Sequence, residues 1–231
     1  MRKIKILILS TFFVLPNLMY GIVGLGFNVV QDGGAKIGTA EYQEGEGLLL
    51  MTMETFELET SPIGFGGYIF IDLAGWAVEL EANAVGALYK MDFSNVITSY
   101  DSVSFGWGRG STAITIKKNI ADFSIPLLAK TALSVGVGIN THSSTPKASP
   151  SMIKELTGSD DIINAEFTEE KLINYLKENK IDASGIHAQL GLRFKVLIAD
   201  AHLNFRYNIA ENVYDGSDSF TEIQIKLGIG F

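Results

Sequence analysis

Apolar and polar residues alternate without a break along the last twelve residues of the chain, 220–231. Successive side chains of a β-strand point to opposite faces, so a period of two predicts a strand. A strand with one apolar face exposes both its backbone and that face unless it has neighbours, so we expect it to pair on both sides and to face lipid. The apolar positions are Ile223, Ile225, Leu227, Ile229 and Phe231.

Seven further stretches show similar alternation and predict seven more strands. The eight predicted strands are 23–29, 63–73, 76–89, 119–127, 133–139, 186–194, 203–209 and 220–231. Their connections are alternately long (31–61, 91–118, 141–183, 211–219) and short (74–75, 128–130, 197–200). Long loops at one end and tight turns at the other are typical of outer-membrane barrels, whose termini are both periplasmic when the strand number is even.

The pattern therefore predicts an all-β fold, an eight-stranded antiparallel transmembrane β-barrel with the strands in up-and-down meander order. Ten strands are the alternative, if the segments 48–58 and 100–117 also cross the lipid. Outward aromatic residues close to the short turns, at Trp76, Phe194 and Phe231, suit the aromatic girdle of such a barrel.

The longest connection, about 141–183, carries the helical signals of the chain. Ser149 followed by Pro150 is a typical helix start, and Gly158 is a typical stop. Thr168 precedes a second segment, in which Leu172, Ile173 and Leu176 share one helical face. We interpret this third extracellular loop as a partly helical lid on the barrel rim, with a helix dedicated to a partner as the alternative.

The N-terminus has the features of a secretory signal peptide. Three basic residues in the first five positions precede an apolar run at 6–15, which is too short to span a bilayer. We expect a signal peptide at 1–21 and a barrel domain at 22–231. No later segment contains eighteen consecutive apolar residues, so a barrel is the remaining way for the exported chain to cross a membrane.

Composition excludes several classes of site. Without the three basic residues of the signal, 18 − 3 = 15 Lys and Arg stand against 26 Asp and Glu, a net charge of 15 − 26 = −11. Such a chain should avoid nucleic acid. There are no cysteines, so disulfides, thiolate metal sites and cysteine nucleophiles are excluded.

Three stretches resemble small outer-membrane β-barrel proteins of the OmpA/OmpX-like superfamily. They are the C-terminal Lys226-Leu227-Gly228-Ile229-Gly230-Phe231, the stretch from Asp122 to Lys130, and the hairpin from Leu190 to Tyr207. The resemblance implies export to the outer membrane of a Gram-negative-type envelope and insertion by the barrel-assembly machinery, which reads a C-terminal aromatic residue such as Phe231. It implies a fold and an export route, and no activity.

Charged residues at inward positions predict a salt-bridge network inside the barrel. Eight strands enclose a space that side chains fill, and a buried charge is costly unless it is paired. We expect Glu79 or Glu81 to pair with Arg193, Arg206 or Lys226; a charged constriction that selects ions is the alternative reading. The predicted inward charges are Asp72, Glu79, Glu81, Asp122, Arg193, Lys195, Arg206 and Lys226.

Catalysis finds little support in the sequence. His142, His187 and His202 have no serine or carboxylate at a spacing that indicates a catalytic triad or a metal site. We therefore predict no catalytic, cofactor-binding or metal-binding residue, and a non-enzymatic structural or surface-interaction role. The first alternative is a porin-like small pore or solute channel, and the lesser one is a lipid-modifying enzyme. The expected partners are outer-membrane lipid, the assembly machinery and an extracellular partner of the helical loop.

Overall fold

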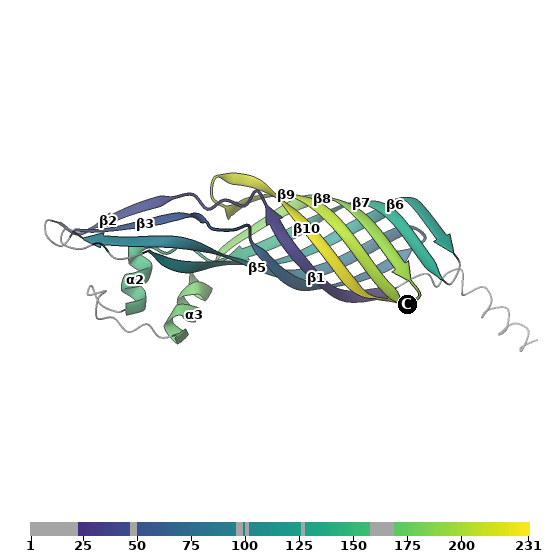
Figure 1. Ribbon diagram of the computed structural model, residues 1–231, viewed down its shortest axis with the longest axis horizontal. Helices are drawn as coiled ribbons and strands as arrows, with labels where there is room; N and C mark the ends of the chain where they lie inside the picture. The colour runs from purple at the N-terminus through teal and green to yellow at the C-terminus, as the bar shows by residue number, and fades with distance from the viewer. Residues whose placement is uncertain (1–22, 47–49, 96–98, 100–101, 126–127, 158–168) are drawn as a thin grey trace, which may run out of the picture.

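The computed structural model describes residues 23–46, 50–95, 99, 102–125, 128–157 and 169–231. The expected signal peptide at 1–21 therefore lies outside the described residues. The protein is elongated, with a barrel at one end and long strands and two helices projecting from the other (Figure 1). We call the projecting end the loop end and the opposite end the turn end.

Ten strands and two helices are described. The strands before the helices are β1 (Val23–Gly33), β2 (Ala40–Glu44), β3 (Met51–Leu58), β4 (Ile63–Leu73), β5 (Trp76–Asn95), β6 (Val103–Ile125) and β7 (Ala129–Ser144). The helices are α2 (Pro150–Thr157) and α3 (Glu169–Glu178), and the last strands are β8 (Ile181–Val196), β9 (Ala199–Tyr214) and β10 (Ser217–Gly230).

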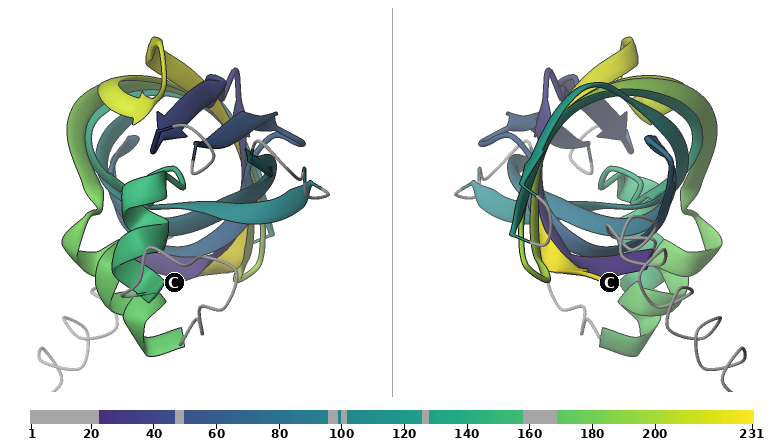
Figure 2. Two further views of the ribbon diagram at one scale, coloured as in Figure 1. Left: turned by 90° about the vertical axis from the view of Figure 1, so that its left-hand side faces the viewer. Right: turned by 90° about the vertical axis from the view of Figure 1, so that its right-hand side faces the viewer.

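Eight of these strands close into a ring. Their order is β5-β4-β1-β10-β9-β8-β7-β6, and β6 pairs with β5 to complete the circle. Every adjacent pair is antiparallel. The end-on views show this ring directly (Figure 2). The predicted eight-stranded antiparallel barrel is confirmed.

The outer wall of the ring is apolar. Aliphatic and aromatic side chains face outward on all eight strands, and Phe27 and Phe65 are 80% and 75% exposed. The inward positions between them carry polar and charged side chains. A barrel that is apolar outside and polar inside, with every backbone group paired around a closed ring, is suited to lipid and unsuited to water. The chain is a transmembrane β-barrel.

Strands β2 and β3 lie outside the ring. β3 pairs with the loop-end half of β5, from Met51↔Asn95 to Leu58↔Tyr89, and β2 pairs with β3. The segment 50–58 therefore extends the wall beyond the barrel and adds no strand to it. The ten-stranded barrel, the alternative left open by the sequence, is not the structure formed.

The predicted bounds of the fourth strand, 119–127, are wrong. β6 begins at Val103, and its part from 103 to 118 pairs with β5, with Lys118 opposite Trp76. Residues 119–125 continue past the end of β5 and pair with β7 alone, and their side chains are mostly exposed. The sequence hid this strand because its outward positions at the loop end are Gly106, Gly108 and Gly110, which give no apolar alternation.

The last predicted loop, 211–219, is also mostly strand. β9 runs to Tyr214 and β10 begins at Ser217, so a tight turn joins them. Gly216 has a φ of 66°, which a residue without a Cβ adopts at little cost. The predicted long connection is therefore a tight turn between two extended strands.

The two helices begin where their sequence signals indicate. The Ser149 hydroxyl accepts a hydrogen bond from the backbone N–H of Met152 at 3.2 Å, which is the contact of a helix N-cap. Gly158 and Thr168 lie outside the described residues. Neither described helix is long and apolar enough to cross a membrane.

The pairing of β5 with β6 can be tested by cross-linking, because the chain has no cysteine. Leu80 lies opposite Ile114, and paired strand residues have Cα separations compatible with a disulfide. We expect Leu80→Cys/Ile114→Cys to oxidise to a single intramolecular disulfide in the folded protein, measured by thiol labelling and intact mass.

The control for this cross-link is Leu80→Cys/Phe123→Cys. Phe123 lies nine residues along β6 from Ile114, roughly 30 Å in an extended strand, so its thiol should stay reduced. Oxidation of the control pair, with free thiols in the Leu80/Ile114 pair, would contradict the register of β6.

Candidate functional site

The interior of the barrel contains equal numbers of buried acidic and basic side chains. Of the charged residues that the structure describes as buried, six are acidic and six are basic. The acids are Asp32, Asp72, Glu79, Glu81, Asp200 and Glu222, and the bases are Arg109, Lys117, Arg193, Lys195, Arg206 and Lys226. Because uncompensated charge is costly away from water, this balance is what an interior filled by side chains requires.

At the middle level of the barrel, two glutamates share three cations. The Lys226 ammonium lies 2.8 Å from the Glu79 carboxylate and also contacts Glu81. Lys117 lies 2.7 Å from the second oxygen of Glu79, and Arg206 donates to Glu81. The four strands β5, β6, β9 and β10 supply these groups, so the network ties opposite walls together.

A second cluster lies at the turn end. Arg193 donates to Asp72 at 2.7 Å and to Asp200 at 2.9 Å, and its guanidinium lies 4.7 Å from the centre of the Phe70 ring. Lys130 approaches Asp72 to 3.5 Å. These contacts join β4, β7, β8 and β9 just inside the turns.

A third cluster lies toward the loop end, around Arg109. Its guanidinium is 2.6 Å from the Asp32 carboxylate and 3.0 Å from Glu222, and it contacts His142 Nδ1 at 2.8 Å. The Tyr214 hydroxyl donates a further hydrogen bond to Asp32. One arginine from β6 thus connects β1, β7, β9 and β10.

Above the third cluster, the mouth of the barrel is closed by an apolar core. Met152, Ile153 and Leu156 of α2 are buried in one cluster with side chains from the strands. Trp107 and Tyr214 pack against each other with their ring centres 5.0 Å apart. The helix α2 therefore acts as the predicted lid on the barrel rim.

Tyr89 anchors the segment that leads into α2. Its hydroxyl oxygen accepts a hydrogen bond from the backbone N–H of Ala148 at 2.8 Å, and its side chain is fully buried. Burial raises the pKa of Tyr89 to about 12, so the hydroxyl stays protonated at neutral pH. This contact fixes the helix to β5 beyond the ring.

The structure places seven of the eight predicted inward charges inside the barrel. The exception is Asp122, which is exposed on the hairpin beyond the turn end because β6 enters the ring earlier in the chain. The interior charges that sequence reasoning missed are Asp32, Arg109, Lys117, Asp200 and Glu222. Glu222 had a usable signal, since it alternates with Ile223 in the last strand, whereas the others fell in predicted loops and turns.

The three histidines all face the filled interior. His187 Nε2 lies 2.9 Å from the Thr115 hydroxyl, His202 Nε2 lies 3.2 Å from Asp200, and His142 contacts Arg109. Over the residues that the structure describes, no three histidine or acidic side chains are arranged to hold a metal ion. The contacts are those of packed interior groups.

The strands beyond the barrel carry a row of acidic residues on their outward face. Glu41 of β2 lies opposite Glu54 of β3, which in turn lies opposite Asp92 of β5. Like charges directly across a ladder destabilise it. We call β2, β3, the loop-end half of β5 and α2 the platform; its other face packs into the apolar core.

Comparisons with known proteins find similar folds and no similar sequence. No protein-family model and no curated protein matches the chain. Ail, the attachment invasion locus protein of Yersinia pestis, solved with the heparin analogue sucrose octasulfate, has a TM-score of 0.43 and 12% identity, covering 92% of this chain and 100% of that one. Neisserial surface protein A has a TM-score of 0.43 and 13% identity, and the match covers 90% of this chain and 97% of that one.

The outer membrane protein OprG from Pseudomonas aeruginosa has a TM-score of 0.37 and 11% identity, covering 89% of this chain and 96% of that one. Similarity at this level transfers no function to this chain. The barrel architecture rests on the strand pairing described above.

Loss of one charge from the middle network should destabilise the barrel. In Glu81→Gln, Lys226 and Arg206 keep their charges but share only Glu79 and Glu222 as acidic partners. We expect the free energy of unfolding to fall by roughly 3–5 kcal/mol, the cost of breaking a buried pair. A urea titration in detergent, with the folded fraction read from heat-modified gel migration, measures this difference in free energy.

Asp122→Asn is the matched control, because it makes the same chemical change at an exposed carboxylate. We expect its unfolding free energy to stay within about 0.5 kcal/mol of the unchanged protein. Equal stability of Glu81→Gln and the unchanged protein would show that the network contributes nothing to stability.

Proposed function

We propose that this protein is a non-enzymatic barrel of the outer membrane that presents the platform at the cell surface for interaction with a partner. The observation that carries this proposal is the filling of the barrel. Three clusters of paired charge occupy the space inside the barrel that a channel would need. The platform, by contrast, is built from strands that continue well beyond the membrane wall.

The expected orientation follows from the loops and turns. In outer-membrane barrels the long loops are extracellular and the short turns periplasmic, so the platform faces outward. Trp76, Phe194 and Phe231 are 52%, 47% and 56% exposed on the outer wall near the turn end, which suits a periplasmic aromatic girdle. Export through the signal peptide at 1–21 and assembly through Phe231 belong to this proposal.

The acidic row favours a cationic partner. Glu41, Glu54 and Asp92 repel one another across three strands, and a bound lysine-rich or arginine-rich surface would relieve that repulsion. The partner we infer is therefore a basic protein or peptide outside the cell. The three histidines point into the filled interior, where a lipid substrate does not reach, and this supports a non-enzymatic role.

A small pore is the second candidate, and one observation favours it. On β7, β8 and β9, the buried polar atoms without a hydrogen-bond partner in the protein include Asn140 Oδ1, Gln189 Nε2 and Asn208 Nδ2. Buried polar atoms of this kind are usually hydrated, so water can occupy this side of the interior.

Conductance separates the two candidates. We expect the unchanged protein in a planar bilayer to give no steady openings, because paired side chains fill the interior of the barrel. The variant Glu81→Ala/Arg206→Ala removes one acid and one base together and should conduct more than the unchanged protein. Steady single-channel openings of the unchanged protein, once folding is verified by heat-modified gel migration, would favour the pore.

The acidic row can be tested with a basic probe. We expect Glu54→Gln to weaken binding of an oligolysine peptide to the protein in nanodiscs by about two- to fivefold, because one of three aligned charges is lost. The same change should slow amide hydrogen exchange in β2 and β3, since the repulsion across the ladder falls. Isothermal titration and exchange mass spectrometry measure the two effects.

The control is Glu211→Gln, which removes another exposed carboxylate, from β9. It should leave both the peptide affinity and the exchange of β2 and β3 unchanged. If both variants weaken the peptide equally, binding reflects total negative charge and the platform has no special part in it.

A further inference from the structure

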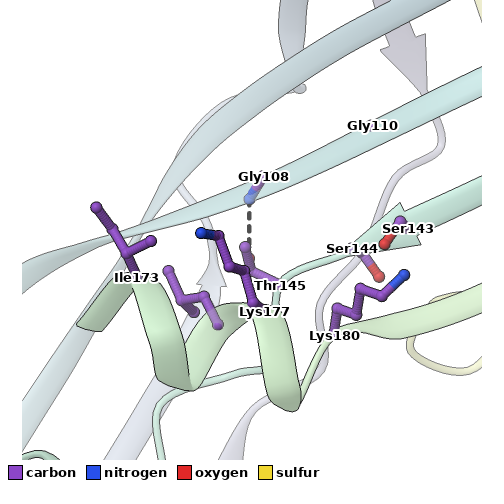
Figure 3. A pocket seen from close by; sticks show the side chains of 9 residues that line it. Gly108, Gly110, Ser143, Ser144, Thr145, Ile173, Lys177 and Lys180 are labelled. Atoms are coloured by element: carbon purple, nitrogen blue, oxygen red, sulfur yellow. Dashed lines mark hydrogen bonds between the residues drawn. The ribbon is translucent and has the colours of Figure 1, made fainter. Parts of the chain in front are cut away.

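A groove lies between α3 and the outer wall of β6 and β7. It has a volume of about 330 Å³, and Gly108 and Gly110 form its floor on the barrel side. Figure 3 shows Ile173 and Lys177 on the helical side of the groove, with Lys180 just beyond the end of the helix. The backbones of the floor are fixed, since Thr145 exchanges hydrogen bonds with Gly108 at 2.9 and 3.0 Å.

The groove continues the lipid-facing wall. Along β6 and β7 the outward pairs run from Ile114↔Ile139 to Thr112↔Thr141 and then to Gly110↔Ser143. The groove therefore starts two outward rows beyond the last aliphatic pair. Four residues of a tilted strand correspond to roughly 10 Å along the barrel axis, which places the groove at the level of lipid headgroups.

The helix α3 uses two faces. Leu172 and Tyr175 pack against the apolar core of the mouth. The groove residues Ile173, Leu176 and Lys177 follow the spacing i, i+3 and i+4 on one face of α3. Lys180 lines the groove two residues beyond the end of the helix, and we call these four residues the stripe. This stripe is apolar in its first half and cationic in its second.

The charges of the stripe stand out in a chain with a formal net charge of −8. Lys180 contacts Asp182 at 2.9 Å, but both side chains are at least half exposed, so the pair is weak and open to competition. Long lysine side chains at a membrane surface place their stems along apolar surface and their ammonium groups at phosphates.

We propose that this groove binds one anionic phospholipid or phosphorylated glycolipid of the outer leaflet. An acyl chain lies on Gly108 and Gly110 against Ile173 and Leu176, and the headgroup phosphate contacts Lys177 and Lys180. This site rests on the proposed placement in the outer membrane, and it takes a lipid whatever the partner of the platform is. The continuity with the lipid-facing wall and the cationic end of the stripe select this occupant.

The charge part of the site is tested with Lys177→Gln/Lys180→Gln. Purified protein in neutral detergent is titrated with phosphatidylglycerol, and retained lipid is counted by native mass spectrometry. We expect the Kd to rise about tenfold, less than two fully available lysines would give, because Lys180 is shared with Asp182. Lys171→Gln, on the opposite face of the same helix, should leave the Kd unchanged.

The groove itself is tested with Gly110→Leu. A Cβ at Gly110 meets its nearest neighbour at 3.9 Å, so the backbone accepts a side chain, and leucine would fill the space of the acyl chain. We expect this variant to lose the high-affinity lipid while staying folded. Gly106→Leu is the control, because a Cβ there meets nothing within 4 Å and Gly106 does not line the groove.

Two further probes identify the source of the phosphate. Phosphatidylcholine with the same acyl chains should bind at least tenfold more weakly, and inorganic phosphate alone should not compete at millimolar concentration. The proposal would be overturned if the lysine variant or Gly110→Leu bound phosphatidylglycerol as tightly as the unchanged protein does. It would also be overturned if the unchanged protein bound phosphatidylcholine as tightly as phosphatidylglycerol. The proposed function would instead be overturned by a protein that shows no heat-modified gel migration and does not float with membranes in a density gradient. The two failures are therefore distinguishable.

Discussion

Charge pairing inside a closed ring of eight strands is the constraint on which the other features depend. Side chains must fill so narrow a ring, and every outward position is given to lipid, so polar groups gather on the inner face. Buried charges are tolerated only when they are paired. Lys226 shows the result, because its ammonium contacts both Glu79 and Glu81. These ion pairs connect opposite walls of the barrel and leave little room along its axis.

Because the interior of the barrel is filled, we place the inferred function at the loop end. The strands β5 and β6 are 20 and 23 residues long, well beyond what is needed to cross a membrane, and they carry β3 and β2 outward with them. The apolar core around Met152 and Tyr89 joins α2 to this extension. The membrane barrel and the platform therefore share continuous strands, and a force on the platform is transmitted directly to the wall.

The outer wall changes composition where it leaves the lipid. On β6 the outward residues pass from Ile116 and Ile114 to Thr112 and then to glycines. An aliphatic side chain is favourable in hydrocarbon, whereas a glycine at the headgroup level leaves space against α3. Two of the three glycine residues that concealed β6 in the sequence, Gly108 and Gly110, thus form the floor of the groove.

Local alternation in the sequence determined the fold class, most of the strands and the inward placement of Glu79, Glu81 and Arg206. The Ser149-Pro150 pair determined the start of α2. Each of these features depends on residues close together in the chain. The tertiary structure alone decided the register between β5 and β6. That register brought Arg109 into the ring and left Asp122 outside it, because alternation gives the faces of a strand but cannot say which of its residues cross the membrane when glycines replace the apolar positions.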